Sequence, residues 1–176
     1  MIRTALFALL LAALSVPALA QHHHAPAASP YAGFERREVK ALSDQQVADL
    51  KAGRGMGYAL PAELNGYPGP SHVLELGEQL GLTEEQRRRM QDLFDAMKAE
   101  TIPIGERLIA QEIALDRQFS GRTVTAASLA DSTAAIGATQ AALRAAHLRY
   151  HLATVAILTP EQVRRYRELR GYVPVE

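Results

Sequence analysis

Residues 82–125 read "LTEEQRRRMQDLFDAMKAETIPIGERLIAQEIALDRQFSGRTVT", and the pattern of this stretch determines the fold class. Its apolar residues recur at steps of three, four or seven positions, which is the spacing of one face of an α-helix. A helical tract is therefore predicted from Thr83 to about Phe119. The residues of its apolar seam are Met90, Phe94, Met97, Ile104, Leu108 and Leu115.

Two features limit this tract. Proline removes one helical hydrogen bond and disfavours the helical conformation in the residue before it, so Pro103 predicts a kink or a break near Ile102. Residues 121–125, "GRTVT", predict a short turn at the end of the tract. If it were unbroken, the helix would extend on the order of 50 Å.

A second long helix is predicted after the turn, and it runs to about Leu158. Because the turn is short and both tracts carry seven-residue apolar spacing, we expect them to pack antiparallel as a hairpin. No stretch shows the sustained alternation of a β-strand. The predicted fold class is therefore all-α, a long helical hairpin with short flanking helices. The apolar residues of the second tract are Ile136, Leu143, Tyr150 and Ile157.

A five-residue pattern occurs at both ends of the hairpin, as "LTEEQ" at 82–86 and as "LTPEQ" at 158–162. A looser copy, "LSDQQ", occupies residues 42–46. Threonine or serine at the N-cap and glutamine three residues later form a capping box, in which each side chain bonds the other residue's backbone N–H. The pattern therefore predicts three helix starts. The N-cap residues are Ser43, Thr83 and Thr159, and Gly53 and Gly171 are expected to end the first and last helices.

The segment from Gly53 to Pro70, "GRGMGYALPAELNGYPGP", is rich in glycine and proline, so no single regular element is expected there. It contains too many apolar residues for a solvated linker. We expect an ordered segment laid across the helices, followed by a short helix that Ser71 caps and that continues through Leu80. The apolar residues in question are Met56, Tyr58, Leu60, Leu64 and Tyr67.

The N-terminus has the pattern of a secretory signal peptide over residues 1–20: Arg3, a short apolar run, and Ala-Leu-Ala before the cut. The apolar run is too short to cross a bilayer, so we expect export to the periplasm and no membrane span after cleavage. Residues 21–35 are predicted to be a disordered lead. Residues 36–176 are predicted to form a single helical domain.

Composition excludes several functions. The chain has 19 Lys and Arg against 19 Asp and Glu, a balance that argues against nucleic acid as a partner. It has no cysteine, which excludes disulfides and thiolate metal sites. No serine or acid stands in a recognisable nucleophile pattern, so the sequence predicts a protein that is not an enzyme.

The candidate metal ligands begin with His147 and His151, which lie four residues apart on the second long helix. Two imidazoles at this spacing project from one face and can share a metal ion. The alternative is a narrow solvent-facing stripe, which Arg144 on the same stripe favours because a neighbouring cation opposes a divalent ion. Two nitrogens are also fewer than the three or four ligands that zinc takes.

The other candidates are weaker. His22, His23 and His24 begin one residue after the predicted cut and can bind copper, nickel or zinc, alone or with the new amino terminus, or be an incidental polar tract. His72 and Glu75 form an i, i+3 pair that is expected on the surface. Glu112 lies on the apolar side of the first long helix, where a paired carboxylate at the core edge is the common explanation.

Paired L-T-x-x-Q pentads that flank a helical hairpin behind a signal peptide resemble the Spy/CpxP family of periplasmic stress proteins. This family includes the metal-responsive ZraP and CnrX-type relatives, and the resemblance covers roughly residues 42–171. It implies a hairpin that dimerises into a curved cradle, and a role without enzymatic activity. In CnrX-type sensors a His-x-x-x-Met pair occupies the comparable helix. Here His147 matches the histidine and His151 replaces the methionine, while the upstream His-x-x-x-His half of that site is absent.

Together these patterns predict a non-catalytic, metal-responsive envelope-stress protein of the periplasm, associated with heavy-metal resistance through sensing or binding. A homodimer is expected from the resemblance. Two alternatives stay open: an ATP-independent chaperone that holds unfolded envelope proteins, and a regulatory partner of a membrane sensor kinase.

Overall fold

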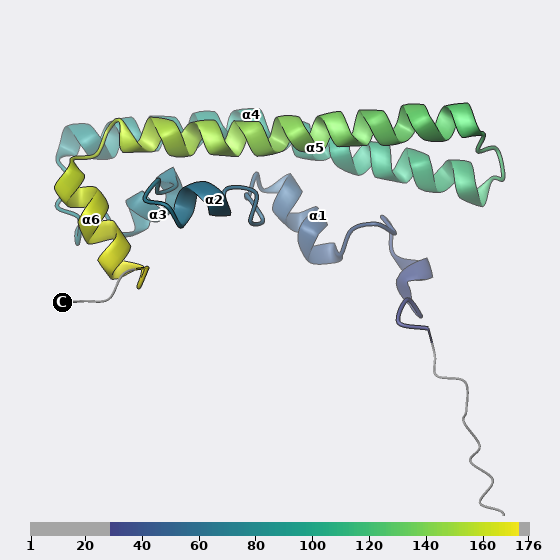
Figure 1. The fold of residues 1–176 in the computed structure, drawn as a ribbon, viewed down its shortest axis with the longest axis horizontal. Helices are drawn as coiled ribbons and strands as arrows, with labels where there is room; N and C mark the ends of the chain where they lie inside the picture. Colours follow the sequence, from purple (N-terminus) through teal and green to yellow (C-terminus); the bar gives the residue numbers. More distant parts are fainter. Residues whose placement is uncertain (1–28, 173–176) are drawn as a thin grey trace, which may run out of the picture. The chain divides into compact units, whose positions relative to one another are not determined.

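The computed structural model describes residues 29–172. The chain divides into two compact units, residues 1–32 and 33–176, and the described helices belong to the second. Within residues 29–172 there are helices and no strand, which confirms the predicted all-α class (Figure 1). The elements are a 3₁₀ helix η1 (Phe34–Arg36), α1 (Asp44–Lys51), α2 (Leu60–Glu63), α3 (Pro70–Glu75), α4 (Glu84–Ser120), α5 (Ala126–Val155) and α6 (Pro160–Leu169).

Helices α4 and α5 form a long antiparallel hairpin (Figure 1). Near the turn, the side-chain amide of Gln118 donates to the hydroxyl of Ser132 at 2.9 Å. Further along, the hydroxyl of Tyr150 donates to Glu100 at 3.0 Å. These contacts fix the register of the two helices and confirm the predicted hairpin. The connecting turn occupies residues 121–125, as the sequence predicts.

Helix α4 continues through Pro103, so of the predicted kink or break near Ile102 the break is wrong. The proline is exposed, whereas Thr101 and Gly105 are buried on the opposite side of the helix. At Gly105 the helix approaches α1 so closely that a Cβ atom there would lie 2.7 Å from the carbonyl oxygen of Leu50. Packing on this face offsets the one hydrogen bond that a proline removes from a helix.

Each of the three pentads begins a helix through the predicted capping box. The hydroxyls of Ser43, Thr83 and Thr159 accept from the backbone N–H three residues later, and the glutamines return the bond. The two pentads of the hairpin also meet each other, which the sequence did not predict. The side-chain amides of Gln86 and Gln162 bond to each other at 2.8 and 3.0 Å. The pattern is therefore a helix start and, at these two positions, a contact between α4 and α6.

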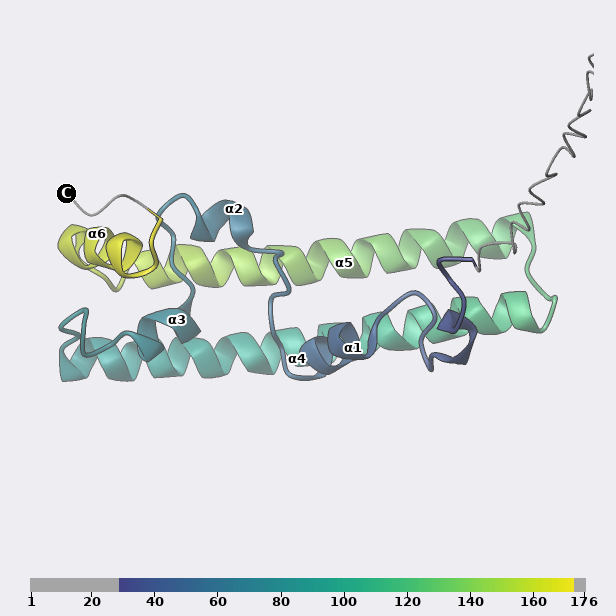
Figure 2. The same ribbon diagram turned by 90° about the horizontal axis from the view of Figure 1, so that it is seen from below.

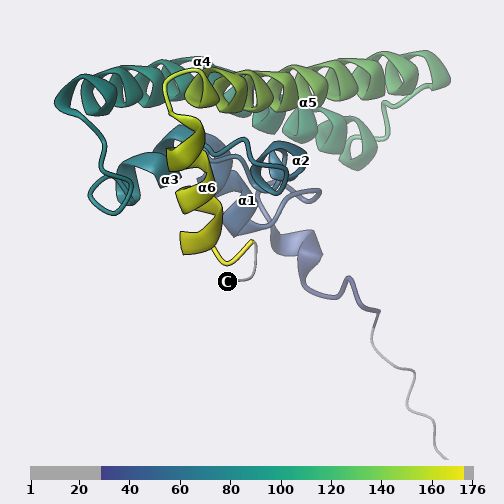
Figure 3. The same ribbon diagram turned by 60° about the vertical axis from the view of Figure 1, so that its left-hand side comes forward.

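The short helices pack on one side of the hairpin (Figures 1 and 3). Helices α1 and α3 pack on α4, and α2 packs on α5. Figure 2 shows α6 beside the final part of α5, at the end of the hairpin away from the turn. Residues 53–70 thus cross from α4 to α5 through α2 and return to α4 at α3. This confirms the expectation of an ordered segment laid across the helices.

Helix α3 differs from its prediction. It begins at Pro70 with Gly69 as the N-cap and ends at Glu75, so Ser71 does not cap it and it does not reach Leu80. Proline is favoured at the first helical position because its missing N–H has no intrahelical partner there, and this accounts for the earlier start. Residues 76–81 form turns.

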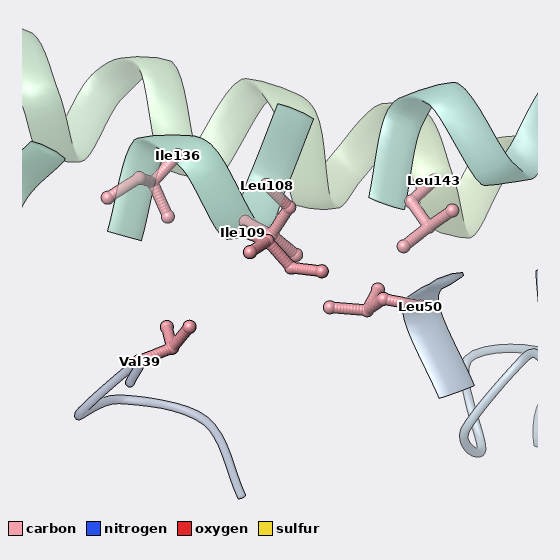
Figure 4. Close-up of a cluster of buried hydrophobic side chains, with 6 residues drawn as sticks. All are labelled: Val39, Leu50, Leu108, Ile109, Ile136 and Leu143. Carbon is pink, nitrogen blue, oxygen red and sulfur yellow. The ribbon is translucent and has the colours of Figure 1, made fainter. Parts of the chain in front are cut away.

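Two apolar clusters hold these elements to the hairpin. The first lies at the middle of the hairpin and consists of Val39, Leu50, Leu108, Ile109, Ile136 and Leu143 (Figure 4). The second lies where α3 and α6 meet α4 and consists of Val73, Leu80, Met90 and Tyr166. Fully burying one such side chain contributes about 1.5–3 kcal/mol. The clusters therefore fix α1, α3 and α6 against the long helices.

The N-terminal predictions fall mostly outside the described residues. This holds for the signal peptide at residues 1–20 and for most of the lead at residues 21–35. The end of that range, residues 33–35, belongs to the second unit, where the backbone N–H of Gly33 donates to Glu35 at 2.7 Å beside η1. Among residues 29–172, no helix combines the length and the apolar character needed to cross a membrane.

Candidate functional site

His147 and His151 lie on successive turns of α5, and both are buried, with 3 % and 8 % of their surface exposed. The pair therefore faces the interior of the fold, and the alternative of a solvent-facing stripe is wrong. Arg144, which was expected on the same stripe, is exposed. Solvent screens its charge, so it opposes a cation at the histidines less than the sequence suggested.

The glycine-rich segment after α1 covers both imidazoles. A Cβ atom on Gly55 would lie 3.4 Å from Nδ1 of His147, and one on Gly69 would lie 3.0 Å from Nε2 of His151. The backbone can approach the rings this closely because glycine has no side chain. Residues 53–70 thus pack against both histidine rings. The sequence did not indicate a role for this segment, and the structure shows that it covers the candidate ligands.

A backbone carbonyl orients the ring of His151. Its Nδ1 lies 2.6 Å from the carbonyl oxygen of Tyr67 and 3.8 Å from Oε2 of Glu63. Because a carbonyl oxygen can only accept, Nδ1 carries the proton in this arrangement. Nε2 then keeps its lone pair, and no residue among 29–172 bonds to it. Metal-ligating histidines are typically held in this way, with the second ring nitrogen donating to a carbonyl or a carboxylate.

His147 has a buried ring nitrogen, Nε2, without a hydrogen-bond partner in the described part of the chain. Burial lowers the pKa of His147, because removal from water disfavours the charged ring, and the neighbouring His151 lowers it further. Glu100 acts in the opposite direction. The ring is therefore neutral at pH 7, which is the form that binds a metal ion.

The structure adds a carboxylate that the sequence analysis missed. Glu63, the last residue of α2, is 5 % exposed. Its Oε1 accepts from the hydroxyls of Tyr166 and Tyr172, and its Oε2 accepts from the backbone N–H of Gly69 at 3.2 Å. Burial by itself would raise the pKa of Glu63, but His72 and the two tyrosine hydroxyls outweigh it and lower the pKa to about 2. The sequence signal for this residue is a single acid within an apolar, glycine- and proline-rich segment.

His72 lies on α3, next to Glu63. Its Nδ1 is 3.5 Å from Oε1 of Glu63, which makes an ion pair when the ring is protonated. The predicted pair with Glu75 is absent from the contacts of residues 29–172. The fold therefore brings His72 to the same carboxylate that His151 approaches, although the two histidines are distant in sequence.

Glu112 is not brought to this place. Glu112 lies on α4 twelve residues beyond Glu100, which is about 18 Å at 1.5 Å per residue. It is half-buried, and burial raises its pKa. The lead histidines His22, His23 and His24 lie outside the described residues, so their role as ligands stays a prediction.

The histidines of α5 and the groups around Glu63 share one cleft of about 580 Å³. Within residues 29–172, no three His, Cys, Asp or Glu side chains are already placed to hold a metal ion together. The residues present thus offer a transition metal two imidazole nitrogens, Nε2 of His151 and the unpartnered, buried Nε2 of His147. A further ligand must complete the coordination shell. Polar lining residues include Asp49, Glu63, His72, Glu75, His147 and His151, and apolar ones include Met56, Phe94 and Met97.

Comparison with known proteins supplies a family. A family model described as heavy-metal resistance matches residues 60–165, a range that includes Glu63, His72, both histidines of α5 and both pentads of the hairpin. No curated protein and no solved structure matches the chain. The match confirms the resemblance that the pentads indicate. The chain therefore belongs to the heavy-metal resistance family, within the Spy/CpxP-like group of periplasmic metal-resistance proteins.

Proposed function

We propose that this heavy-metal resistance protein binds a transition-metal ion through His147 and His151 and acts as a non-catalytic, metal-responsive protein of the periplasm. The observation that carries the proposal is the burial of both histidines at one cleft, with the ring of His151 held by the carbonyl of Tyr67. Membership of a non-enzymatic resistance family supports it. Zinc, nickel, cobalt and copper ions are the candidates, because imidazole nitrogen suits these metals.

Among the described residues the site is incomplete before the ion arrives, and this favours a response over simple storage. Zinc takes three or four protein ligands, and the pair supplies two. Further donors can come from the carboxylate of Glu63 or the ring of His72, from the lead histidines, or from a second copy of the chain. Glu63 and His72 must move toward the pair to serve as ligands, because no three such side chains among the described residues are already placed to hold an ion together. A ligand that drives such a movement shifts the population of conformations, and a partner protein can detect that shift.

The proposal includes export and assembly. The signal-peptide pattern of residues 1–20 and the typical location of the family support a periplasmic protein. A homodimer follows from the resemblance, with a membrane sensor protein as the partner of the metal response. Sedimentation at tens of micromolar, roughly the range for an interface of ordinary strength, tests the dimer, and a pure monomer would contradict it.

The test of metal binding is a calorimetric titration of the chain without residues 1–20, using zinc, nickel, cobalt and copper ions in turn. The change His151→Ala should abolish tight binding, whereas removal of residues 21–30 should remove weak sites alone. Gln140→Ala, on the same helix and outside the cleft lining, is the matched control and should bind as the parent does. Bound metal should also raise the melting temperature. Equal affinity in the parent and in His151→Ala would overturn the proposal.

A second candidate function has its own supporting observation. The α2 segment exposes three large apolar side chains, with 51 % of Leu60, 51 % of Leu64 and 40 % of Tyr67 open to solvent. Leu152 on α5, the helix against which α2 packs, is 58 % exposed. Grouped apolar surface of this kind suits a chaperone that holds unfolded chains.

The chaperone alternative is tested by light scattering from a reduced model protein that aggregates. A chaperone should suppress the scattering without metal, and the double change Leu60→Ser and Leu64→Ser should weaken that suppression. Full suppression by this variant would remove the structural support for the alternative. The same variant should keep the metal affinity of the parent, because neither leucine supplies a donor atom.

A further inference from the structure

The carboxylate of Glu63 lies between the histidine cleft and α6, and its two oxygens face different neighbours. Oε1 accepts from the hydroxyl of Tyr166 on α6 and, at 3.0 Å, from that of Tyr172 beyond it. Nε of Arg170 is 3.9 Å from the same oxygen. Oε2 is 3.8 Å from Nδ1 of His151 on α5. One buried carboxylate thus connects the C-terminal part of the fold to the candidate metal ligand.

The polar contacts of α6 divide between its two ends. At the start of the helix, Gln162 bonds Gln86 and the carbonyl of Leu80. Among the described residues, the later part of α6 and the residues just after it make their polar contacts with the rest of the fold at Glu63, from the hydroxyls of Tyr166 and Tyr172 and from Nε of Arg170. The second half of α6 therefore depends on the position of Glu63, in addition to the apolar packing of Tyr166.

An ion at His151 changes the surroundings of Glu63. Nδ1 of His151 carries the proton, so the lone pair available to an ion is on Nε2, on the other edge of the ring. A cation bound there would draw electron density from the ring and make the Nδ1–H edge, which bonds the carbonyl of Tyr67, more positive. The anionic Glu63, whose Oε2 lies 3.8 Å from Nδ1, would then be attracted to that edge more strongly. Because coupling between two binding events is reciprocal, a well-held Glu63 also favours the ion.

We propose that Glu63 couples the histidine site to α6, so that an ion bound through His151 fastens the second half of α6 to the rest of the fold. This inference rests on the proposed metal binding, and it names the conformational effect that the bound ion would have on α6. In this role Glu63 acts on His151 through its charge, while the carbonyl of Tyr67 orients the ring, and Glu63 is not required as a direct ligand. Tyr166 and Tyr172 extend the same connection from the cleft to the C-terminal residues.

The experiment follows backbone hydrogen exchange of residues 163–172 in the full chain, with and without Ni²⁺. In the parent, saturating Ni²⁺ should slow exchange in this segment several-fold, and His151→Ala should show no such slowing. Tyr166→Phe removes one hydroxyl from Glu63 and should bind Ni²⁺ more weakly, by less than the roughly tenfold loss typical of a group that bonds the metal ligand itself. Tyr58→Phe is the matched control, because its hydroxyl makes no hydrogen bond among the described residues and Tyr58 does not line the cleft, and it should bind as the parent does.

A second measurement, made without metal, tests the contact of Glu63 with Tyr166 and Tyr172 by itself. Glu63→Gln keeps the shape of the side chain but removes its charge and should speed exchange of residues 163–172 several-fold. Unchanged exchange in that variant would overturn the coupling even if metal binds.

The remaining outcomes separate the two proposals. Binding through His151 with no change in α6 and normal affinity in Tyr166→Phe would overturn the coupling and leave the proposed function standing. Faster exchange of α6 on adding Ni²⁺ would also overturn it, because the ion would then take Glu63 from the tyrosines. Absence of any binding that His151→Ala removes would overturn both.

Discussion

Gln86 and Gln162 form a reciprocal pair of side-chain hydrogen bonds, although they belong to the starts of two different helices. Each Oε1 also accepts from the backbone N–H of its own N-cap threonine, at 3.1 and 3.0 Å. The side-chain nitrogen of each glutamine therefore remains available to donate to the other glutamine. The nitrogen of Gln86 also donates to the carbonyl of Ile157. Glutamine thus serves two purposes at this position, and a residue that completes only the capping box cannot replace it.

The change Gln86→Glu separates these two purposes. A carboxylate at the third helical position still accepts from the N-cap N–H and is favoured near a helix N-terminus. It cannot donate to Ile157 or Gln162, so it leaves acceptors without their donor. We expect a loss of about 1–3 kcal/mol in the free energy of unfolding, measured by urea denaturation.

Gln46→Glu is the matched control for this prediction. Gln46 completes the capping box of α1 and makes no bond to another helix among the described residues. The same substitution there should change stability by less than about 0.5 kcal/mol. Equal losses in the two variants would show that the contact between the pentads adds nothing to the caps.

Close packing of α1 on α4 gives the second prediction. Gly105→Ala places a Cβ atom 2.7 Å from the carbonyl oxygen of Leu50, so the backbone of one helix must shift. We expect a net loss of about 1–3 kcal/mol in the free energy of unfolding, despite the better helix propensity of alanine. Gly137→Ala, at an open position of α5, should instead stabilise by about 0.5–1 kcal/mol. A gain in both variants would contradict the close approach.

The third prediction concerns acid. The pKa of Glu63 is about 2 in the folded chain against an ordinary 4.5, so its charge contributes stability above pH 4.5 that is lost as pH falls from about 4.5 to 2. At 1.36 kcal/mol per unit this loss is about 3 kcal/mol. Glu63→Gln should be less stable than the parent at pH 6 and should lose less between pH 5 and pH 2.5. Urea midpoints across this range measure the difference, and parallel curves for the two proteins would count against the assigned pKa.

Local rules account for what the sequence predicted well. The hairpin follows from apolar spacing and a short turn, and the helix starts follow from capping boxes, each of which depends on residues close in the chain. The same rules allowed a break at Pro103 that does not occur, because they do not include the packing of α1 that holds α4 together. They also failed at Ser71, because Pro70 is a better first residue for the helix.

The candidate site was predicted in part, for a related reason. The spacing of His147 and His151 placed them on one face, but spacing does not tell which face is buried. Glu63 was missed because its partners, Tyr166 and His72, come from helices far along the chain or across a turn. Its importance depends on tertiary contacts, and no local pattern contains them.

The last prediction concerns access to His151. The backbone of Gly69 is compatible with alanine, with φ −82° and ψ 151°, so Gly69→Ala should fold. Its new Cβ atom would lie 3.0 Å from Nε2 and from Cε1 of His151, on the edge of the ring that keeps the lone pair. We expect metal affinity to fall about tenfold or more, by analogy with the loss of groups that surround metal ligands.

Gly55→Ala provides a graded comparison, because its Cβ atom would lie 3.4 Å from Nδ1 of His147, an ordinary contact distance. It should lower the affinity less than Gly69→Ala. Calorimetric titration with Ni²⁺ measures both variants, and their melting temperatures without metal show whether each still folds. If Gly69→Ala folds and binds as tightly as the parent, the ion does not use Nε2 of His151, and its ligands must be sought elsewhere in the cleft or in the lead.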